Sequence, residues 1–201
     1  IPLIEVSKDQ RAAAKTVNFA VLYMVGAPTL YRQIVFADSR PEVVGRLMKA
    51  YTVDDCRRFI RGFFHKYKDY GPWMSDTVEF ARRNGYVQNY FGRRRYIESL
   101  HSNNDGIRRH AENQAINTRI QGTAADIANR AFQRISKAFP LHIARPLLMV
   151  HDMIMVECRE DHVETVRSGV QEIMEDPCGR LGQVVPIKVS MEQGYRWKEI
   201  A

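Results

Sequence analysis

The strongest constraint on the fold is a change of hydrophobic pattern at Gly85. Before Gly85, apolar residues recur at helical spacing between glycine and proline breaks. We expect helices at about 8–24, 30–36, 41–49 and 53–70, a break at Gly71-Pro72, and a further helix that ends at Gly85. Ser7 and Gln10 match a capping box at the start of the first helix. The first part of the chain is therefore predicted to be helical.

After Gly85 the pattern becomes mixed. Residues 86–97 are rich in β-formers, and two apolar runs at 147–150 and 154–156 flank a polar centre, so both segments predict hairpins. Helices are expected at 109–139, with an interruption near Gly122-Thr123, and at 161–175, and a last strand at 184–189. The predicted fold class is α+β, a helical subdomain followed by helices packed on an antiparallel sheet.

Composition adds weaker constraints. The 201 residues suffice for one domain or two small subdomains, and the net charge of +7 favours a polyanionic partner. Three scattered cysteines match no zinc spacing and fit a reducing compartment. No apolar run approaches the ~20 residues of a membrane span, so no membrane partner is expected. The chain starts with Ile1, which suggests a piece of a longer protein.

The first candidate site is a stripe on the first helix. Its members lie four residues apart: Arg11, Lys15, Phe19 and Tyr23. Successive members are offset by ~40°, so they form one slanted row. Cations near a helix N-terminus oppose the macrodipole, and a bound triphosphate would compensate them while the aromatic rings met its sugar and base. The alternative is an amphipathic helix with a solvated basic end and two core aromatics.

A second stripe of the same spacing consists of amides, Asn113, Asn117 and Gln121. Such side chains can donate to the minor-groove acceptors, which look alike in every correct base pair. The alternative is a solvated polar face. A third candidate is the segment Val150-His151-Asp152-Met153 between two apolar strands, where a rigidly held carboxylate could bind a divalent cation. The alternative there is a turn Asp beside a hydrogen-bonded His.

In this order the three sites resemble the bacterial DNA polymerase I family, family A. The segment from Arg11 to Tyr23 resembles its nucleotide-binding fingers helix. Four further blocks match in order: Gly85-Tyr86-Val87 with Phe91 to Tyr96, Ala115-Ile116-Asn117 with Gln121 to Ile127, Val150-His151-Asp152, and Gly194-Tyr195-Arg196-Trp197. The resemblance thus covers nearly the whole chain.

The resemblance implies a right-hand fold, with fingers at about 1–85 and palm at about 86–201. Arg11 and Lys15 would bind the incoming dNTP and be catalytic together with Asp152. Phe19 would stack on the base and disfavour dideoxynucleotides, and Tyr23 would sit at the template side. The DNA-binding residues would be Asn113, Asn117, Gln121, His151, Arg93 and Arg94. Asp152 would bind catalytic Mg²⁺, and the reaction would be attack of a primer 3′-hydroxyl on the α-phosphate.

The sequence also departs from the family pattern. The family's other metal-binding aspartate precedes the fingers helix, and only Glu5 and Asp9 are acidic among the ten residues before Arg11. We therefore expect a C-terminal part or split-enzyme half that needs an upstream partner carrying the thumb and first palm motif. Met153 replaces the usual Glu, Ala20 and Met24 replace Gly, and Asn113 stands where some members have Arg.

Three functions remain open at this point. The favoured one is a DNA-directed DNA polymerase acting on primer–template DNA in the cytoplasm of a bacterial or phage-infected cell. The second is a non-catalytic primer–template-binding remnant, which Met153 and the absent aspartate favour. The third is an unrelated basic DNA-binding regulator, which would need a sequence-reading recognition helix that we do not find.

Overall fold

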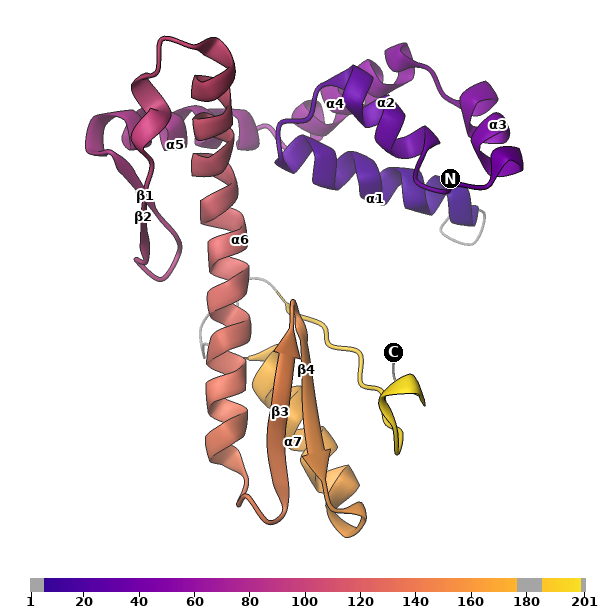
Figure 1. Ribbon diagram of the computed structural model, residues 1–201, viewed down its shortest axis with the longest axis vertical. Coiled ribbons are helices and arrows are strands. Elements are labelled where there is room, and N and C mark those ends of the chain that lie inside the picture. The colour runs from indigo at the N-terminus through magenta and orange to yellow at the C-terminus, as the bar shows by residue number, and fades with distance from the viewer. Residues whose placement is uncertain (1–5, 177–185, 200–201) are drawn as a thin grey trace. The chain divides into compact units, whose positions relative to one another are not determined.

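The computed structural model describes residues 6–176 and 186–199. By internal contacts the chain divides into two compact units, residues 1–120 and 121–201. The helix α6 (Asp105–Ala138) belongs to both, since it runs through the boundary (Figure 1). Among the described residues, no helix combines the length and apolar character that a membrane span requires.

Four helices form the first part of the first unit, and α1 and α2 each pack on α4. They are α1 (Lys8–Leu22), α2 (Ala27–Val35), α3 (Pro41–Ala50) and α4 (Val53–Lys66). Their core is small and apolar, with Leu30 fully buried against Ala13, Ala20 and Cys56. A side cluster around Val35 and Leu47 attaches α3 to α2.

The rest of the first unit is built on α5 (Tyr70–Asn84). Gly85 ends this helix in the left-handed conformation, with φ 76°, which glycine adopts without the steric cost of a Cβ. The short strands β1 (Tyr86–Gln88) and β2 (Arg94–Tyr96) form an antiparallel hairpin, and the 3-10 helix η2 (Glu98–His101) leads towards α6. Val87 and Leu100 are buried against Ala111 and Ala115 of α6.

The second unit packs helices on one face of a hairpin. The strands β3 (Ala144–Val150) and β4 (Met153–Cys158) pair antiparallel, with an irregularity between Pro146 and Leu148. The helix α7 (Val163–Glu175) follows the 3-10 helix η3 (Glu160–His162), and a short 3-10 turn, η4, spans Trp197–Glu199. The core joins Ile135 of α6 to Val166, Val170 and Ile173 of α7.

The α+β prediction is confirmed, but three local predictions need correction. Gly71-Pro72 does not break a helix; both residues lie in the first turn of α5, where a proline lacks only an N–H that would have no helical partner. Gly122-Thr123 does not interrupt α6, which is continuous. Residues 186–189 of the predicted last strand are not in a strand, and 184–185 lie outside the described residues.

Candidate functional site

The stripe on α1 is a continuous stack of side chains. The predicted capping box begins the helix, since the Ser7 Oγ accepts from the Gln10 N–H at 3.2 Å and Gln10 Oε1 accepts from the Ser7 N–H at 2.9 Å. Lys15 Nζ lies 5.9 Å from the centre of the Phe19 ring, and the Phe19 and Tyr23 rings stack with centroids 6.3 Å apart. A cation and two aromatic rings are therefore in register along one row.

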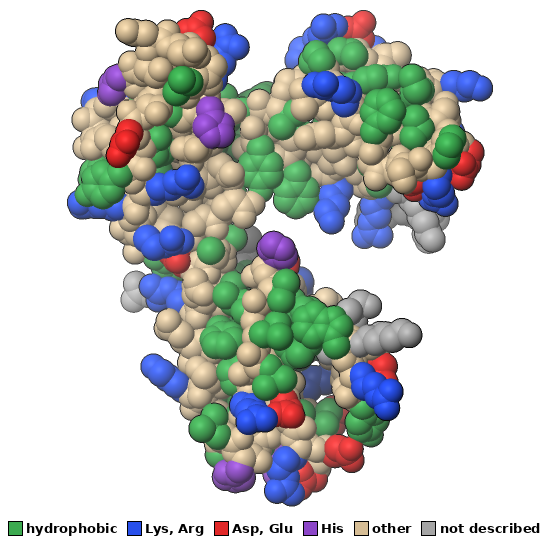
Figure 2. Space-filling view, in the orientation of Figure 1, with side chains coloured by type: hydrophobic (Ala, Val, Ile, Leu, Met, Phe, Trp, Pro, Cys, Tyr) green, Lys and Arg blue, Asp and Glu red, His purple; other side chains and the backbone are tan. Residues whose placement is uncertain are grey.

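This row is on the outer side of the helix. Arg11 and Lys15 are exposed, and Phe19 keeps 48% of its surface exposed. The residues that α1 contributes to the core are others, Ala13 and Ala20. Figure 2 shows Lys and Arg side chains gathered along α1 beside aromatic ones. Phe19 is therefore not a core residue, and its ring is open to solvent.

The end of α1 is a Schellman motif with an unusual residue. The Val25 N–H donates to Ala20 O at 2.8 Å and the Met24 N–H to Val21 O at 3.1 Å, while Met24 has φ 55°. Glycine is the usual residue for this left-handed position. The motif turns the chain directly after Tyr23, so Tyr23 is held as the C-cap at the end of the stripe.

The β1–β2 hairpin carries the arginine cluster. Its turn is fixed by Asn89, 6% exposed, whose Oδ1 accepts from the N–H groups of Phe91 and Arg93, each at 3.0 Å. The Arg94 guanidinium lies 4.6 Å from the centre of the Tyr86 ring and remains exposed. Arg95 donates to Thr118 Oγ1 at 3.2 Å, which connects the arm to α6. The arm thus holds cations on an ordered surface.

The amide stripe lies on α6. Asn113 and Asn117 are half-buried and Gln121 is exposed. The Oδ1 of Asn117 is buried and has no hydrogen-bond partner. A buried polar atom without a partner costs about 1–3 kcal/mol. The unpartnered amide oxygen therefore lowers the stability of this unit.

An anchor that the sequence did not reveal holds this part of α6 against α5. Arg119 donates to the buried Thr77 Oγ1 at 2.7 Å, and its guanidinium lies 5.0 Å from the centre of the Trp73 ring. Arg82 of α5 forms an ion pair with Glu112. Arg119 is two residues from Asn117 and therefore points ~200° away from it around the helix. The spacing shows that Arg119 is not part of the amide stripe, but it does not show which residue Arg119 contacts.

The third site is the tight tip of the β3–β4 hairpin. Val150 pairs with Met153, which leaves His151 and Asp152 as a two-residue turn. His151 has φ 55°, a positive value that tight hairpin turns require and that non-glycine residues seldom adopt. Both side chains are exposed. The turn therefore presents a carboxylate and an imidazole from a paired, twisted ribbon.

The tip does not make a metal site by itself. Within the part of the chain that the structure describes, no group of three or more His, Cys, Asp or Glu side chains comes together. A two-metal site needs carboxylates that bridge ions roughly 4 Å apart. Asp152 is one oxygen donor, and Met153 next to it offers none. The described donors alone therefore do not fit a magnesium pair.

Apolar side chains of this hairpin are exposed near its tip. Leu147, Met149 and Val150 of β3 are exposed, whereas Ile154 and Val156 of β4 contact the core. Figure 2 shows the corresponding hydrophobic surface over β3 and β4. The sheet has two strands, so each strand has one unpaired edge within the described residues. Exposed edges and apolar patches of this kind favour association with another segment.

Comparison with known proteins decides the family. The model of DNA polymerase family A matches residues 1–199. The chain belongs to DNA polymerase family A. It is 32% identical over 197 residues to the thermostable DNA polymerase I of Thermus aquaticus, and 34% identical over 201 residues to DNA polymerase I of Pseudomonas aeruginosa. These matches cover 98% and 99% of this chain but 22% and 20% of the relatives.

A solved structure supports the assignment. The POL domain of Pol1 from M. smegmatis, in complex with DNA primer-template and dNTP, superposes with a TM-score of 0.74 at 27% identity. The match covers 88% of this chain and 29% of that one. The family A chain thus spans about a fifth to a third of the polymerases it matches, and the predicted family resemblance is confirmed.

Proposed function

We propose that this family A chain is the fingers-and-palm part of a DNA-directed DNA polymerase. Residues 1–85 would be the fingers and 86–201 the palm. The observation that carries the proposal is the exposed row on α1, in which Lys15, Phe19 and Tyr23 are stacked in register beyond Arg11. Two cations followed by two stacked rings match in order the phosphates, the sugar and the base of a nucleotide.

The row matches the chemistry of a deoxynucleoside triphosphate. Arg11 and Lys15 offer charge-assisted hydrogen bonds to phosphates, the Arg with a planar fork and the Lys as a point charge. Phe19 presents its face to the base and sugar, and Tyr23 ends the row where a template base would lie. The Lys15–Phe19 contact orients both side chains before a nucleotide arrives, which lowers the entropy cost of binding.

The α6 amides and the arginine arm would hold primer–template DNA. Asn113, Asn117 and Gln121 would donate to minor-groove acceptors, and Arg93 and Arg94 would meet phosphates. His151 would contact the primer end. This division suits an enzyme that accepts any sequence, because minor-groove acceptors report correct pairing rather than base identity.

Asp152 would supply one ligand of the magnesium pair that family A polymerases use, and further carboxylates must come from outside the described residues. Magnesium would stabilise charge on the transferred phosphate when bound. The exposed apolar side chains and unpaired edges of the β3–β4 hairpin support an upstream partner segment, with the thumb and first palm motif, that packs there. The proposed reaction takes place in the cytoplasm of a bacterial or phage-infected cell, and the bacterial relatives support the bacterial setting.

Primer extension with a matched pair of variants tests the proposed row. The chain is assayed together with its upstream part, and Lys15→Ala is compared with Lys49→Ala, an exposed lysine in the last turn of α3. Losing a charge-assisted contact of about 1.5–3 kcal/mol lowers kcat/KM for dNTP by roughly 10- to 150-fold. Equal values for both variants would refute the assignment of the row.

A second reading is a non-catalytic remnant that binds primer–template DNA. The lone carboxylate at the tip and Met153 favour it. It predicts duplex binding whose affinity falls steeply with salt, but no extension when the upstream part is present. A sequence-specific regulator would instead discriminate strongly among duplexes of different sequence.

A further inference from the structure

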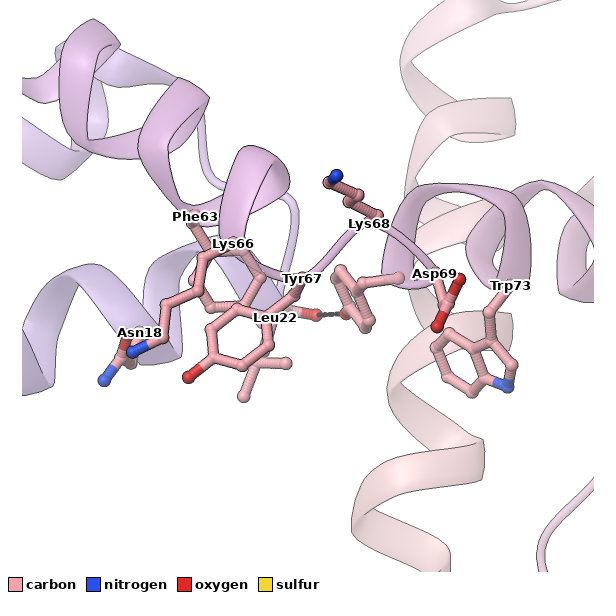
Figure 3. Close-up of a pocket in the computed structure, with 9 residues that line it drawn as sticks. Asn18, Leu22, Phe63, Lys66, Tyr67, Lys68, Asp69 and Trp73 are labelled. Carbon is pink, nitrogen blue, oxygen red and sulfur yellow. Dashed lines mark hydrogen bonds between the residues drawn. The ribbon is translucent and has the colours of Figure 1, made fainter.

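The helix α5 contacts both of the helices that carry the proposed binding residues. Its first turn reaches the end of α1, because the Tyr70 hydroxyl donates to the carbonyl of Leu22 at 3.0 Å, shown as a dashed line in Figure 3. Further along, Trp73 and Thr77 both contact Arg119 of α6. The α1 row and the α6 amide stripe are therefore attached to the same helix.

The contact with α1 lies directly before the end of the row. The last carbonyls of a helix have no partner within it, and Tyr70 satisfies that of Leu22, the residue before Tyr23. Burial, with a smaller contribution from Tyr23, raises the pKa of Tyr70 to about 12. The hydroxyl therefore stays protonated at physiological pH and keeps donating, which fixes the end of the row against α5.

Stacked groups continue from this contact to α6. The Tyr70 and Trp73 rings have centroids 5.5 Å apart with an interplanar angle of 23°. The Arg119 guanidinium lies 5.0 Å from the centre of the Trp73 ring and donates to the buried Thr77 Oγ1 at 2.7 Å. An unbroken series of contacts thus joins Leu22 at the end of α1 to Arg119.

The position of the Tyr70 ring is fixed by a second aromatic neighbour. The Phe63 ring of α4 meets it edge-on, with centroids 5.7 Å apart and an interplanar angle of 79°. With Asn18 of α1 and Trp73, these two rings line an aromatic pocket of about 870 Å³ (Figure 3). A ring held by Phe63 and Trp73 keeps its hydroxyl directed at the α1 carbonyl.

The residues that anchor α6 on α5 lie on the side of α6 opposite the amides. Glu112, which forms an ion pair with Arg82 of α5, and Arg119 are seven residues apart and so lie within ~20° of each other around the helix. Both point roughly 140–160° away from Asn117. These two anchors fix the rotation of α6 about its axis, and this rotation sets the direction in which the amides point.

We propose that Tyr70, Trp73 and Arg119 are positioning residues that hold the nucleotide row of α1 in register with the amide stripe of α6. The inference rests on the proposed polymerase function, in which the row binds the nucleotide and the stripe binds primer–template DNA. None of the three is among the proposed ligand contacts, so each acts through other residues. A misplacement of about 1 Å between reactants can slow a reaction ~100-fold. Loss of the link therefore slows nucleotide addition without weakening the binding of either ligand.

Single-turnover incorporation of one nucleotide separates positioning from binding. The chain is assembled with its upstream part on primer–template DNA, and the concentration of competent complex is determined by titration with duplex. Arg119→Lys keeps the charge but loses the planar guanidinium that lies on Trp73. It should lower the maximal incorporation rate by roughly 2- to 30-fold and leave the dNTP and duplex affinities within about 2-fold. Arg83→Lys, an exposed arginine of α5 outside the link, should change none of these values.

Tyr70→Phe tests the other end of the link. It keeps the ring and removes one hydrogen bond, so the rate should fall by roughly 2- to 13-fold, whereas Tyr67→Phe, an exposed tyrosine three residues earlier, should have no effect. Because this change is conservative, it decides the question even if Arg119→Lys does not fold. The double variant should be about as slow as the slower single variant, since both changes break one link. Independent effects would multiply, and that result would overturn the inference.

The same measurements separate this inference from the proposed function. Unchanged rates for Tyr70→Phe and Arg119→Lys, in a protein that extends primers when unaltered, refute the inference alone. So does a loss of dNTP or duplex affinity as large as the loss of rate, because the residues would then act on binding. An unaltered complex that binds duplex but extends no primer refutes the proposed function as well as the inference.

Discussion

Replacing Asn117 by Ala should make the protein more stable. The buried Oδ1 of Asn117 has no hydrogen-bond partner, so its removal recovers a penalty of about 1–3 kcal/mol. Alanine also has the better helix propensity, by up to about 0.7 kcal/mol. Asn113→Ala, four residues earlier on α6, gains only the better helix propensity, because Asn113 has no buried polar atom without a hydrogen-bond partner.

The difference in stability between the two variants measures the cost of the unpartnered Asn117 oxygen. Both residues belong to the first unit, so the same unfolding transition reports on both. With a urea dependence of about 2 kcal/mol per molar, Asn117→Ala should raise the midpoint above that of Asn113→Ala by roughly 0.5–1.5 M. Duplex affinity should fall for Asn117→Ala at the same time. An Asn117→Ala variant less stable than Asn113→Ala would refute the reasoning.

Two further predictions concern stability. Leu30→Ala should destabilise the first unit by about 2–5 kcal/mol, since Leu30 is 0% exposed, and Met48→Ala, 51% exposed, should change urea unfolding by less than about 0.5 kcal/mol. Hydrogen bonds from Arg40 lower the pKa of Asp38 to about 2. The ionised Asp38 therefore stabilises the folded state above the unfolded-state pKa of about 4, and this stabilisation is lost as the pH falls towards 2. Asp38→Asn should therefore flatten the acid-side decline in the thermal midpoint, and an unchanged slope would contradict it.

The sequence predicted features that depend on local chemistry. The Ser7–Gln10 capping box, the Gly85 helix end and the two hairpins follow from residue type and spacing, and all are present. The α1 spacing also predicted the row of side chains, although it could not show that Phe19 faces solvent rather than the core.

Features that depend on packing or on position within a helix were missed. Pro72 signals a break when taken alone, but in a first turn it is compatible with helix. Gly122 weakens a helix by about 1 kcal/mol, which a long packed helix tolerates. The Arg119 anchor and the aromatic pocket join residues more than 40 positions apart, such as Asn18 and Phe63, so spacing carried no signal of them.

Magnesium-dependent primer extension tests the central claim most directly. The chain is mixed with its upstream part, primer–template DNA and dNTPs, and Asp152→Ala is compared with Glu160→Ala, an exposed acid eight residues away on η3. The account predicts extension by the unaltered chain and by Glu160→Ala, and none by Asp152→Ala. Extension that survives Asp152→Ala would contradict it.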